Sequence, residues 1–356
     1  MLENTLKPPS SSPAISRLVV IWGLFFLICF SLGYPTLNRY EPSTAAATTY
    51  ASLPDTQYYA SLVENGFMEE PDSYWRYRVL VPYVAKPFYR LFKGNIGSWN
   101  PIFFSLLIAN SLFVASAALF LFLVGFTVSG SRTVGFISSL LCLSHFNVSN
   151  LLLAGLVDSG ELFVLVFVTW LLLQQKWQML PFVAVLAFLT RETTVVFMVG
   201  LATGWLIADY HQYRSKLSDV YSKAFYICIS IAIGLGGIVL LRYIGTSKIV
   251  SPLLFGGHVG GINLTIFYIG LKGLVTSKAL IYAFIWLLPL GLLGLISIPK
   301  NWLWATIFTT VGALFLIVLM NAGENAGRPL FNVAGPMLIV AAASYITKIL
   351  NLNSPS

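Results

Sequence analysis

Apolar runs of membrane-spanning length recur along the chain and alternate with short polar stretches. The first run covers residues 17–36 and the second covers 101–128, after a loop of about sixty residues. The remaining runs cover 133–150, 159–174, 178–190, 192–208, 223–244, 279–298, 302–321 and 329–347. A helix of about 20 apolar residues crosses the hydrocarbon core of a bilayer. The pattern therefore predicts about ten transmembrane helices, with 178–208 alternatively forming one broken helix.

Composition supports the same fold class. Hydrophobic residues make up 57% of the 356 residues and charged residues only 10%. A transmembrane β-barrel would show segments of about ten alternating residues, and the sequence has none. We expect an all-α polytopic membrane protein with one transmembrane domain over 17–347.

Basic residues favour an orientation with both ends of the chain in the cytoplasm, since short cytoplasmic loops are enriched in lysine and arginine. With the N-terminus inside, the inner loops carry Arg132, Lys176, Arg214, Lys216, Lys223, Lys300 and Lys348. The outer loops contain Lys248, Lys272 and Lys278, which weakens the bias without reversing it. Residues 1–16, rich in proline and serine, are expected to form a disordered cytoplasmic tail, and 348–356 a second one.

The net charge of +8 does not indicate a nucleic-acid partner, because most basic residues stand in short loops beside apolar runs. Cys29, Cys142 and Cys228 fall inside apolar runs, so neither a disulfide nor a metal site is expected. No cleavable signal peptide is expected, since the run after Arg17 is long enough to remain as an anchor. Compact loops favour a bacterial inner membrane over the endoplasmic reticulum.

The outer loop at 37–100 contains a polar island, "PDTQYYASLVENG", over residues 54–66. Within it, Tyr58, Tyr59, Leu62 and Val63 recur at the spacing of one helical face. Asp55 stands where an N-cap belongs and Gly66 where a C′ glycine belongs. The island is therefore predicted to be a short capped helix on the membrane surface.

A second interfacial helix is predicted from "YRVLVPYVAKPFYRLF", bent or broken near Pro82 and Pro87. Its expected apolar side opposes a basic side of Lys86, Arg90 and Lys93. The expected apolar side consists of Leu80, Tyr83, Val84, Phe88, Leu91 and Phe92.

Charged residues also mark the outer ends of several spans. Asp158 and Glu161 open the run at 159–174, and Arg191 and Glu192 interrupt "LAFLTRETTVVF". Glu324 and Arg328 stand between the last two spans. A charge within the membrane costs about 2.5–3.5 kcal/mol on insertion scales, so such residues normally pair or line a wet cavity. The predicted topology brings all six to one face as a cluster of acids and arginines.

Each of these charges also has a purely structural explanation. Asp55 can serve only as an N-cap, and Asp158 and Glu161 can simply favour a helix dipole. Arg191 and Glu192 can form an ion pair at a helix break. Arg328 can mark a helix start that contacts lipid head groups.

These features together resemble the GT-C superfamily, the membrane glycosyltransferases that use polyprenyl-phosphate-linked sugars. The first outer loop carries a D-x-x-x-Y pattern, here Asp55 and Tyr59. An acid opens a short span in "DSGELFVLVFVTWLLL", and "LAFLTRETTVVF" is similar to a family break with the pattern T-[KR]-E. "GRPLFNVAGPMLIVAA" is similar to a late family span with an outer arginine.

The resemblance covers roughly residues 17–347 and implies a function. The family's loop acid is its proposed catalytic base, so Asp55 would deprotonate an acceptor hydroxyl and the sugar would be transferred with inversion. Arg191 or Arg328 would hold the donor phosphate, and Tyr58, Tyr59, Trp75 and Tyr77 would stack on sugar faces. The expected substrate-binding residues are Tyr58, Tyr59, Arg78, Asp158, Glu161, Arg191, Glu192, Glu324 and Arg328.

Two departures from the family pattern bear on activity. Many members have two adjacent acids in the first loop, whereas Thr56 follows Asp55 here. No soluble outer domain that could recognise an acceptor is expected either. Two other functions therefore remain open: a transporter or flippase of lipid-linked saccharides, and a non-catalytic scaffold of the same fold.

For the transferase, no cofactor is expected, because the lipid-linked sugar is itself the donor. A divalent metal has no support in the sequence, and no metal ligands are assigned. The expected partners are the polyprenyl-phosphate sugar, the membrane lipid, and an acceptor glycan, lipid or protein.

Overall fold

The computed structural model describes residues 15–40, 54–66, 77–97, 99–213, 217–246, 264–320 and 322–350, and these contain helices and no strand. The helices are α1 (Ile15–Tyr40), α2 (Pro54–Asn65), α3 (Leu80–Phe92), α4 (Pro101–Ser129), α5 (Arg132–Leu143), α6 (Asp158–Leu173), α7 (Leu180–Thr190), α8 (Glu192–Tyr213), α9 (Leu217–Thr246), α10 (Leu264–Val275), α11 (Lys278–Phe284), α12 (Leu287–Gly294), α13 (Lys300–Leu319) and α14 (Gly327–Ile349). Short π or 3₁₀ turns lie at Val148–Leu152, Trp177–Met179, Leu295–Ser297 and Gly323–Asn325. The all-helical fold class is confirmed for these residues.

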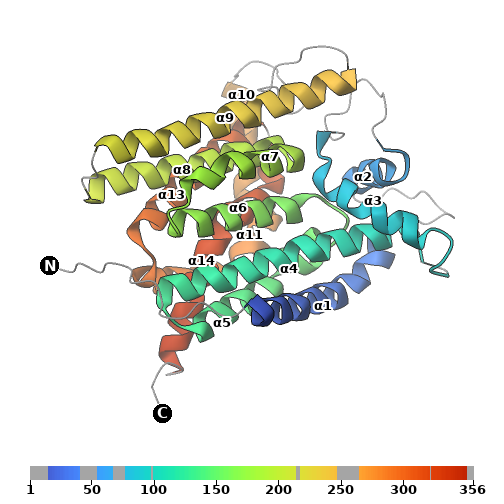
Figure 1. The fold of residues 1–356 in the computed structure, drawn as a ribbon, viewed down its shortest axis with the longest axis horizontal. Helices are drawn as coiled ribbons and strands as arrows, with labels where there is room; N and C mark the ends of the chain where they lie inside the picture. Colours follow the sequence, from blue (N-terminus) through green and yellow to red (C-terminus); the bar gives the residue numbers. More distant parts are fainter. Residues whose placement is uncertain are drawn as a thin grey trace.

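The long helices run side by side as a bundle, with α2 and α3 at one end (Figure 1). We call this end the α2/α3 end; the opposite end holds the connections from α4 to α5, α6 to α7 and α8 to α9. Helix α14 lies in the core, with 83% of its most apolar window buried, whereas α1 lies at the periphery with 11% buried. Apolar contacts join most of the helices into one large core, and a second, smaller cluster packs α2 and α3 against α4.

Six described helices are long and apolar enough to cross a membrane: α1, α4, α8, α9, α13, and α14 together with the turn before it. A seventh span exists if α11 and α12, which meet at a bend of 44°, count as one. Helices occupy all ten predicted runs, but α5, α6 and α7 have 12, 16 and 11 residues. At 1.5 Å per residue these are about 16–24 Å long, shorter than the roughly 30 Å core of a bilayer. The polytopic character is thus supported, and the count of ten spans is not confirmed.

Residues 178–208 form two antiparallel helices and not one broken helix. Lys223 of α9 lies 5.2 Å from the ring centroid of Trp177, just before α7, and 2.9 Å from the carboxylate of Asp209 near the end of α8. The start of α7 and the end of α8 therefore both lie beside Lys223, as expected for two antiparallel helices. The turn between them is Arg191, whose backbone is extended at φ −169° and ψ 146°.

Helix α2 ends as the sequence predicted. Gly66 has φ +79°, which glycine adopts without steric cost, and its amide donates to the carbonyl of Leu62 at 3.1 Å. The N-cap prediction is wrong, because α2 begins at Pro54 and Asp55 is its second residue. Tyr59, Leu62 and Val63 are buried as expected, but Tyr58 is 42% exposed and lies outside the buried face.

Helix α3 packs through a different face from the predicted one. Val81, Ala85 and Tyr89 are buried, while Tyr83 and Leu91 of the predicted apolar side are 44% and 64% exposed. The helix has apolar residues on two sides, so periodicity alone does not choose the side that meets the bundle. The predicted break is not observed, because α3 continues through both prolines. Pro82 lies in the first turn, where the missing N–H has no helical partner to lose, whereas Pro87 lies inside the helix and removes one backbone hydrogen bond.

One helix was not predicted, and some predictions fall outside the described residues. Helix α10 lies in what the sequence suggested was an outer loop near 245–278. The predicted tail at 1–16 is described only from Ile15, where α1 has already begun, and the predicted tail at 348–356 only as far as Leu350.

Candidate active site

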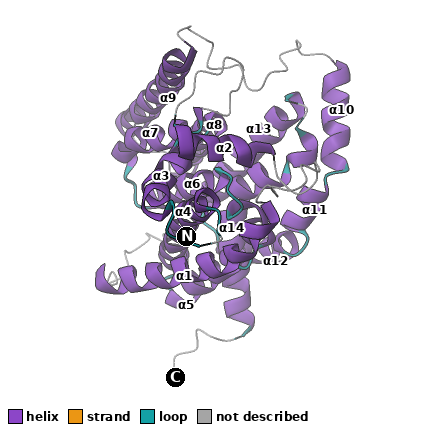
Figure 2. Cartoon of the chain, turned by 90° about the vertical axis from the view of Figure 1, so that its right-hand side faces the viewer, coloured by secondary structure: helices purple, strands orange, loops and turns teal. Residues whose placement is uncertain are grey.

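The site lies beneath α2 and α3, where α6 begins and α7 ends. In Figure 1, α6 stops short of the end of α4, and α2 and α3 lie beyond it. Seen from that end, they lie in front of the bundle (Figure 2). Close contacts fix this position: a Cβ at Gly160 of α6 would meet Val81 of α3 at 3.3 Å, and one at Gly155 would meet Thr56 of α2 at 3.7 Å. The first turn of α6 is thus covered by α2 and α3.

Asp158, the first residue of α6, joins two arginines from other parts of the chain. Its carboxylate lies 3.3 Å from Arg191 in the α7–α8 turn and 3.5 Å from Arg328 at the start of α14. The side chain of Asp158 is 6% exposed, while both arginine side chains are 21% exposed. Asp158 is therefore a buried anchor for two partly accessible guanidinium groups.

Glu161 lies one turn after Asp158 and is fully buried. One carboxylate oxygen accepts hydrogen bonds from the hydroxyls of Thr193 and Thr194 at 3.2 and 3.0 Å. The other accepts from the amide of Asn332 at 3.0 Å, and that amide also donates to the backbone carbonyl of Asp158 at 3.4 Å. Glu161 thus ties α6 to α8 and α14 and holds the Asp158 turn in place.

Glu192, next to Arg191, forms a second centre. It lies 3.5 Å from Arg78, which precedes α3, and 3.7 Å from Arg242 near the end of α9. Arg78 in turn donates to the hydroxyl of Tyr59 on α2 at 3.4 Å. Since Arg78 and Arg242 are only 9% and 3% exposed, this centre is the more enclosed of the two. It connects the outer loop directly to the bundle.

Burial and neighbouring charges shift the pKa values of Tyr59 and Arg78. Burial raises the pKa of Tyr59, Arg78 opposes this, and the negative charges of Asp55 and Asp158 add to the rise. Burial alone would lower the pKa of Arg78, but Tyr59, Glu192 and Asp158 together raise it above its ordinary value. Arg78 therefore stays charged and Tyr59 stays a neutral phenol at neutral pH.

Asp55 itself is partly exposed. Within the described part of the chain, no residue forms an ion pair or side-chain hydrogen bond with it. It lies one turn before Tyr59 on α2, so its carboxylate is near the charge cluster without being neutralised by it. Such a carboxylate can accept a proton from a bound hydroxyl group.

The structure brings most of the predicted residues together, and leaves two apart. Asp158, Glu161, Arg191, Glu192, Arg328, Arg78 and Tyr59 belong to the cluster. Glu324 does not: it is exposed and forms no ion pair with any described residue. Tyr58 is exposed, as described above.

Sequence reasoning missed Arg242 and Asn332. Arg242 was taken as part of an apolar run, although a lone arginine one turn from the end of a span is itself a signal of pairing. Asn332 lies four residues after Arg328, on the same face of α14. Within the described residues, no group of three or more His, Cys, Asp or Glu side chains could hold a metal ion.

The arrangement can bind an anion and support proton transfer. Arg191 and Arg328 are partly exposed and share the one carboxylate of Asp158, so each keeps N–H donors that a ligand can meet. Guanidinium groups bind phosphate through paired N–H donors. The chain matches no protein-family model, no curated protein and no solved structure.

Proposed function

We propose that this protein is a membrane glycosyltransferase that moves a sugar from a polyprenyl-phosphate donor to an acceptor hydroxyl. The reaction takes place at the α2/α3 end of the bundle, on the periplasmic side of a bacterial inner membrane. The donor approaches sideways from the lipid, and the acceptor hydroxyl belongs to a glycan, a lipid or a protein.

The proposal rests on the unused hydrogen-bond donors of Arg191 and Arg328. Each is partly exposed, and each offers Asp158 one terminal nitrogen. A guanidinium has five N–H donors, and the Nε of Arg191 is buried with no hydrogen-bond partner in the described residues. A buried donor without a partner costs about 1–3 kcal/mol, which a bound acceptor would recover. The phosphate of the donor lipid is the acceptor group that suits this pair.

Asp55 serves as the general base. The acceptor oxygen forms a bond to the anomeric carbon as the bond from that carbon to the phosphate oxygen breaks, and Asp55 takes the hydroxyl proton. Polyprenyl phosphate leaves with the electron pair, and attack from the opposite face inverts the anomeric configuration. Arg191 and Arg328 stabilise the negative charge that grows on the leaving phosphate.

The distribution of charge favours this function over transport. A transporter of lipid-linked saccharides should have a charged or broken site near the middle of the membrane. The bend between α11 and α12 is one break in a span, but none of the ion pairs among the described residues involves these two helices. The ion pairs of the described residues lie instead at the two ends of the bundle: Asp209 with Lys223 at one end, and the arginine cluster at the other. A chemical site at one membrane face fits a transferase.

The proposal is tested with purified full-length protein and a panel of polyprenyl-phosphate sugars, measuring sugar transfer and binding of the lipid. We expect Asp55→Asn to lower turnover at least about 100-fold, because general base catalysis contributes about 10²–10⁴-fold. Lipid binding should stay unchanged, since the arginines remain. Glu64→Gln removes a carboxylate at the other end of α2 and should leave turnover intact. Undiminished turnover in Asp55→Asn would exclude Asp55 as the base, and lipid binding with no transfer by the wild-type protein across the panel would favour a scaffold.

A further inference from the structure

An apolar groove runs along the outside of the bundle between α8 and α13. It consists of two adjoining hollows of about 530 and 730 Å³, which share Trp304 and Phe308. On α13, residues at helical spacing line it and are 41–61% exposed: Trp304, Ile307, Phe308, Val311 and Phe315. Among the described residues, these side chains therefore form an apolar groove that is open to the outside of the bundle.

Two glycines of α8 form the floor of the groove. Gly200 and Gly204 are four residues apart, so both face α13. A Cβ at Gly204 would lie 2.9 Å from the Cα of Ala305, and one at Gly200 would lie 3.1 Å from the side chain of Thr309. Small residues at this spacing allow membrane helices to approach closely. The floor is thus rigid backbone.

One end of the groove is basic. Lys300 is the first residue of α13, His211 lies in the last turn of α8, and both line the first hollow and are exposed. Within the described residues Lys300 has no ion pair, and no acidic side chain lines either hollow. The nearest acid on α8, Asp209, is bound by Lys223 and Asn301.

The groove is long enough for one acyl chain. Its lining on α13 runs from Lys300 to Phe315, fifteen residues that span about 22 Å at 1.5 Å per residue. Half of a hydrocarbon core of roughly 30 Å is about 15 Å, so the groove covers the depth of one leaflet and continues beyond it. A cation at the membrane surface, followed by an apolar strip at least as long as one leaflet is deep, matches a phosphate head group and its acyl chain.

We propose that the groove between α8 and α13 binds a phospholipid with an anionic head group. Its phosphate contacts Lys300 and His211, and one acyl chain lies along Trp304, Phe308 and Val311. This end of the bundle is opposite to Asp158 and Arg191, so the site is separate from the proposed donor site and does not depend on the proposed function.

Two variants separate the head-group contact from the chain contact. Lys300→Gln removes the cation but keeps the length of the side chain. Gly312→Leu fills the groove: a Cβ at Gly312 meets no atom within 4 Å, and helical side chains tilt toward the N-terminus, in the direction of Phe308. Lys348→Gln is the matched control, an exposed lysine in the last turn of α14 that lines neither hollow.

Native mass spectrometry of the full-length protein measures binding of phosphatidylglycerol and of phosphatidylcholine with the same acyl chains. We expect wild-type protein to bind phosphatidylglycerol about fivefold more tightly, the effect of one lysine on an anionic lipid. Lys300→Gln should abolish this preference, Gly312→Leu should weaken binding of both lipids, and Lys348→Gln should change neither. Equal binding of the two lipids by the wild-type protein, or the same loss in Lys348→Gln as in Lys300→Gln, would overturn the proposal. Displacement of phosphatidylglycerol by polyprenyl phosphate, one for one, would also overturn it and assign the groove to the donor lipid.

Discussion

At the scale of single residues, the cluster contains carboxylates held in two different ways. Asp158 and Glu192 are each bound by two arginines, so their charge is compensated. Glu161 is held by two threonine hydroxyls and one asparagine amide. Its role is therefore to satisfy three buried donors from two neighbouring helices. This makes Glu161 a structural residue, and Asp158 the residue through which the structure acts on a ligand.

Replacing Glu161 with leucine should destabilise the fold by at least about 2 kcal/mol, because the hydroxyls of Thr193 and Thr194 lose their acceptor and each costs about 1–3 kcal/mol unpaired. The amide of Asn332 keeps the backbone carbonyl of Asp158 as a partner. Glu161→Gln keeps the shape and one acceptor oxygen, so its loss should be at most about half as large. Thermal unfolding in a single detergent measures both. Equal stability of the leucine variant and the wild-type protein would show that these hydrogen bonds contribute nothing.

The residues of the site were predictable only in part from the sequence. Asp158, Arg191 and Arg328 stand out because charge at the end of an apolar run demands an explanation. The ion pairs between Asp158 and the two arginines do not follow from sequence spacing. They form because the first turns of α6, α8 and α14 lie at the same level of the bundle. Arg242 was hidden for the same reason: its partner Glu192 is fifty positions away, on a different helix.

At the scale of helices, apolar runs locate the elements but not their lengths or contact faces. The run at 133–150 becomes a helix of 12 residues followed by a π turn, since Ser144, His145 and Asn147 bond locally and end α5. The apolar residues of α3 cover two faces, and only the assembled bundle decides which is buried. Short helices then leave room for α2 and α3 to cover the site. Hydropathy does not encode these unequal helix lengths, which position the charged residues beneath α2 and α3.

The contact between α4 and α5 depends on glycines in both helices. A Cβ at Gly135 would lie 2.5 Å from the carbonyl oxygen of Phe122, closer than real side chains come. We therefore expect Gly135→Ala to force the helices apart and to lower the unfolding temperature measurably. Gly236→Ala on α9 is the control, because its Cβ meets nothing within 4 Å and alanine favours helix by about 1 kcal/mol over glycine. If both alanines raised the unfolding temperature alike, close α4–α5 packing would not be limiting.

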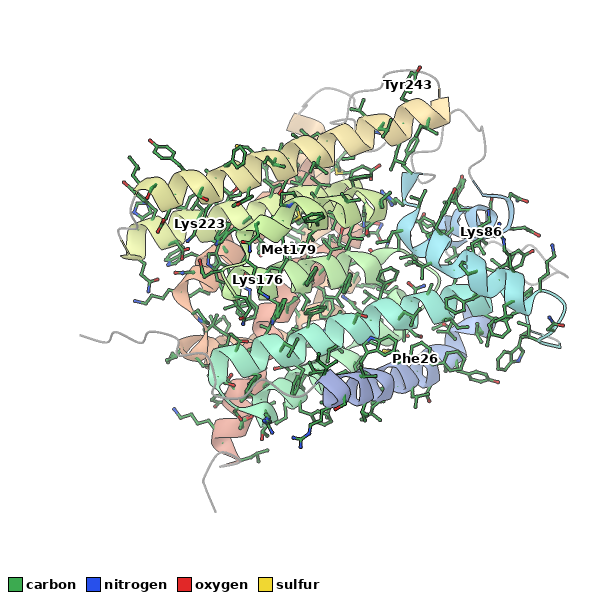
Figure 3. The ribbon with its side chains drawn as sticks, viewed as in Figure 1. Phe26, Lys86, Lys176, Met179, Lys223 and Tyr243 are labelled. Carbon is green, nitrogen blue, oxygen red and sulfur yellow. The ribbon has the colours of Figure 1, made fainter. Side chains whose placement is uncertain are left out.

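At the scale of the whole molecule, both ends of the bundle carry basic residues, and the ends differ in how those residues are bound. Lys176 and Lys223 lie at one end, opposite to Lys86 and Tyr243 (Figure 3). At the α2/α3 end, Arg191 and Arg328 both pair with Asp158. Arginines that pair with a buried carboxylate should influence membrane orientation less than exposed lysines in short loops, which favour the cytoplasmic side. We therefore predict that the end with Lys176 and Lys223 faces the cytoplasm and that Arg191 and Arg328 lie on the outer side.

Orientation is the prediction on which the site of catalysis depends, and single cysteines test it. Glu64→Cys at the α2/α3 end and Lys348→Cys at the other end are introduced after Cys29, Cys142 and Cys228 are replaced by alanine. A membrane-impermeant thiol reagent added to intact cells should label Glu64→Cys at once, and Lys348→Cys only after the membrane is opened. Both positions are exposed, so failure to label reflects the membrane and not burial. The reverse pattern would put Asp55 and the arginine cluster in the cytoplasm, where a donor lipid would have to present its sugar on the inner leaflet. It would leave the buried ion pairs unchanged, because they depend on helix packing and not on the side of the membrane.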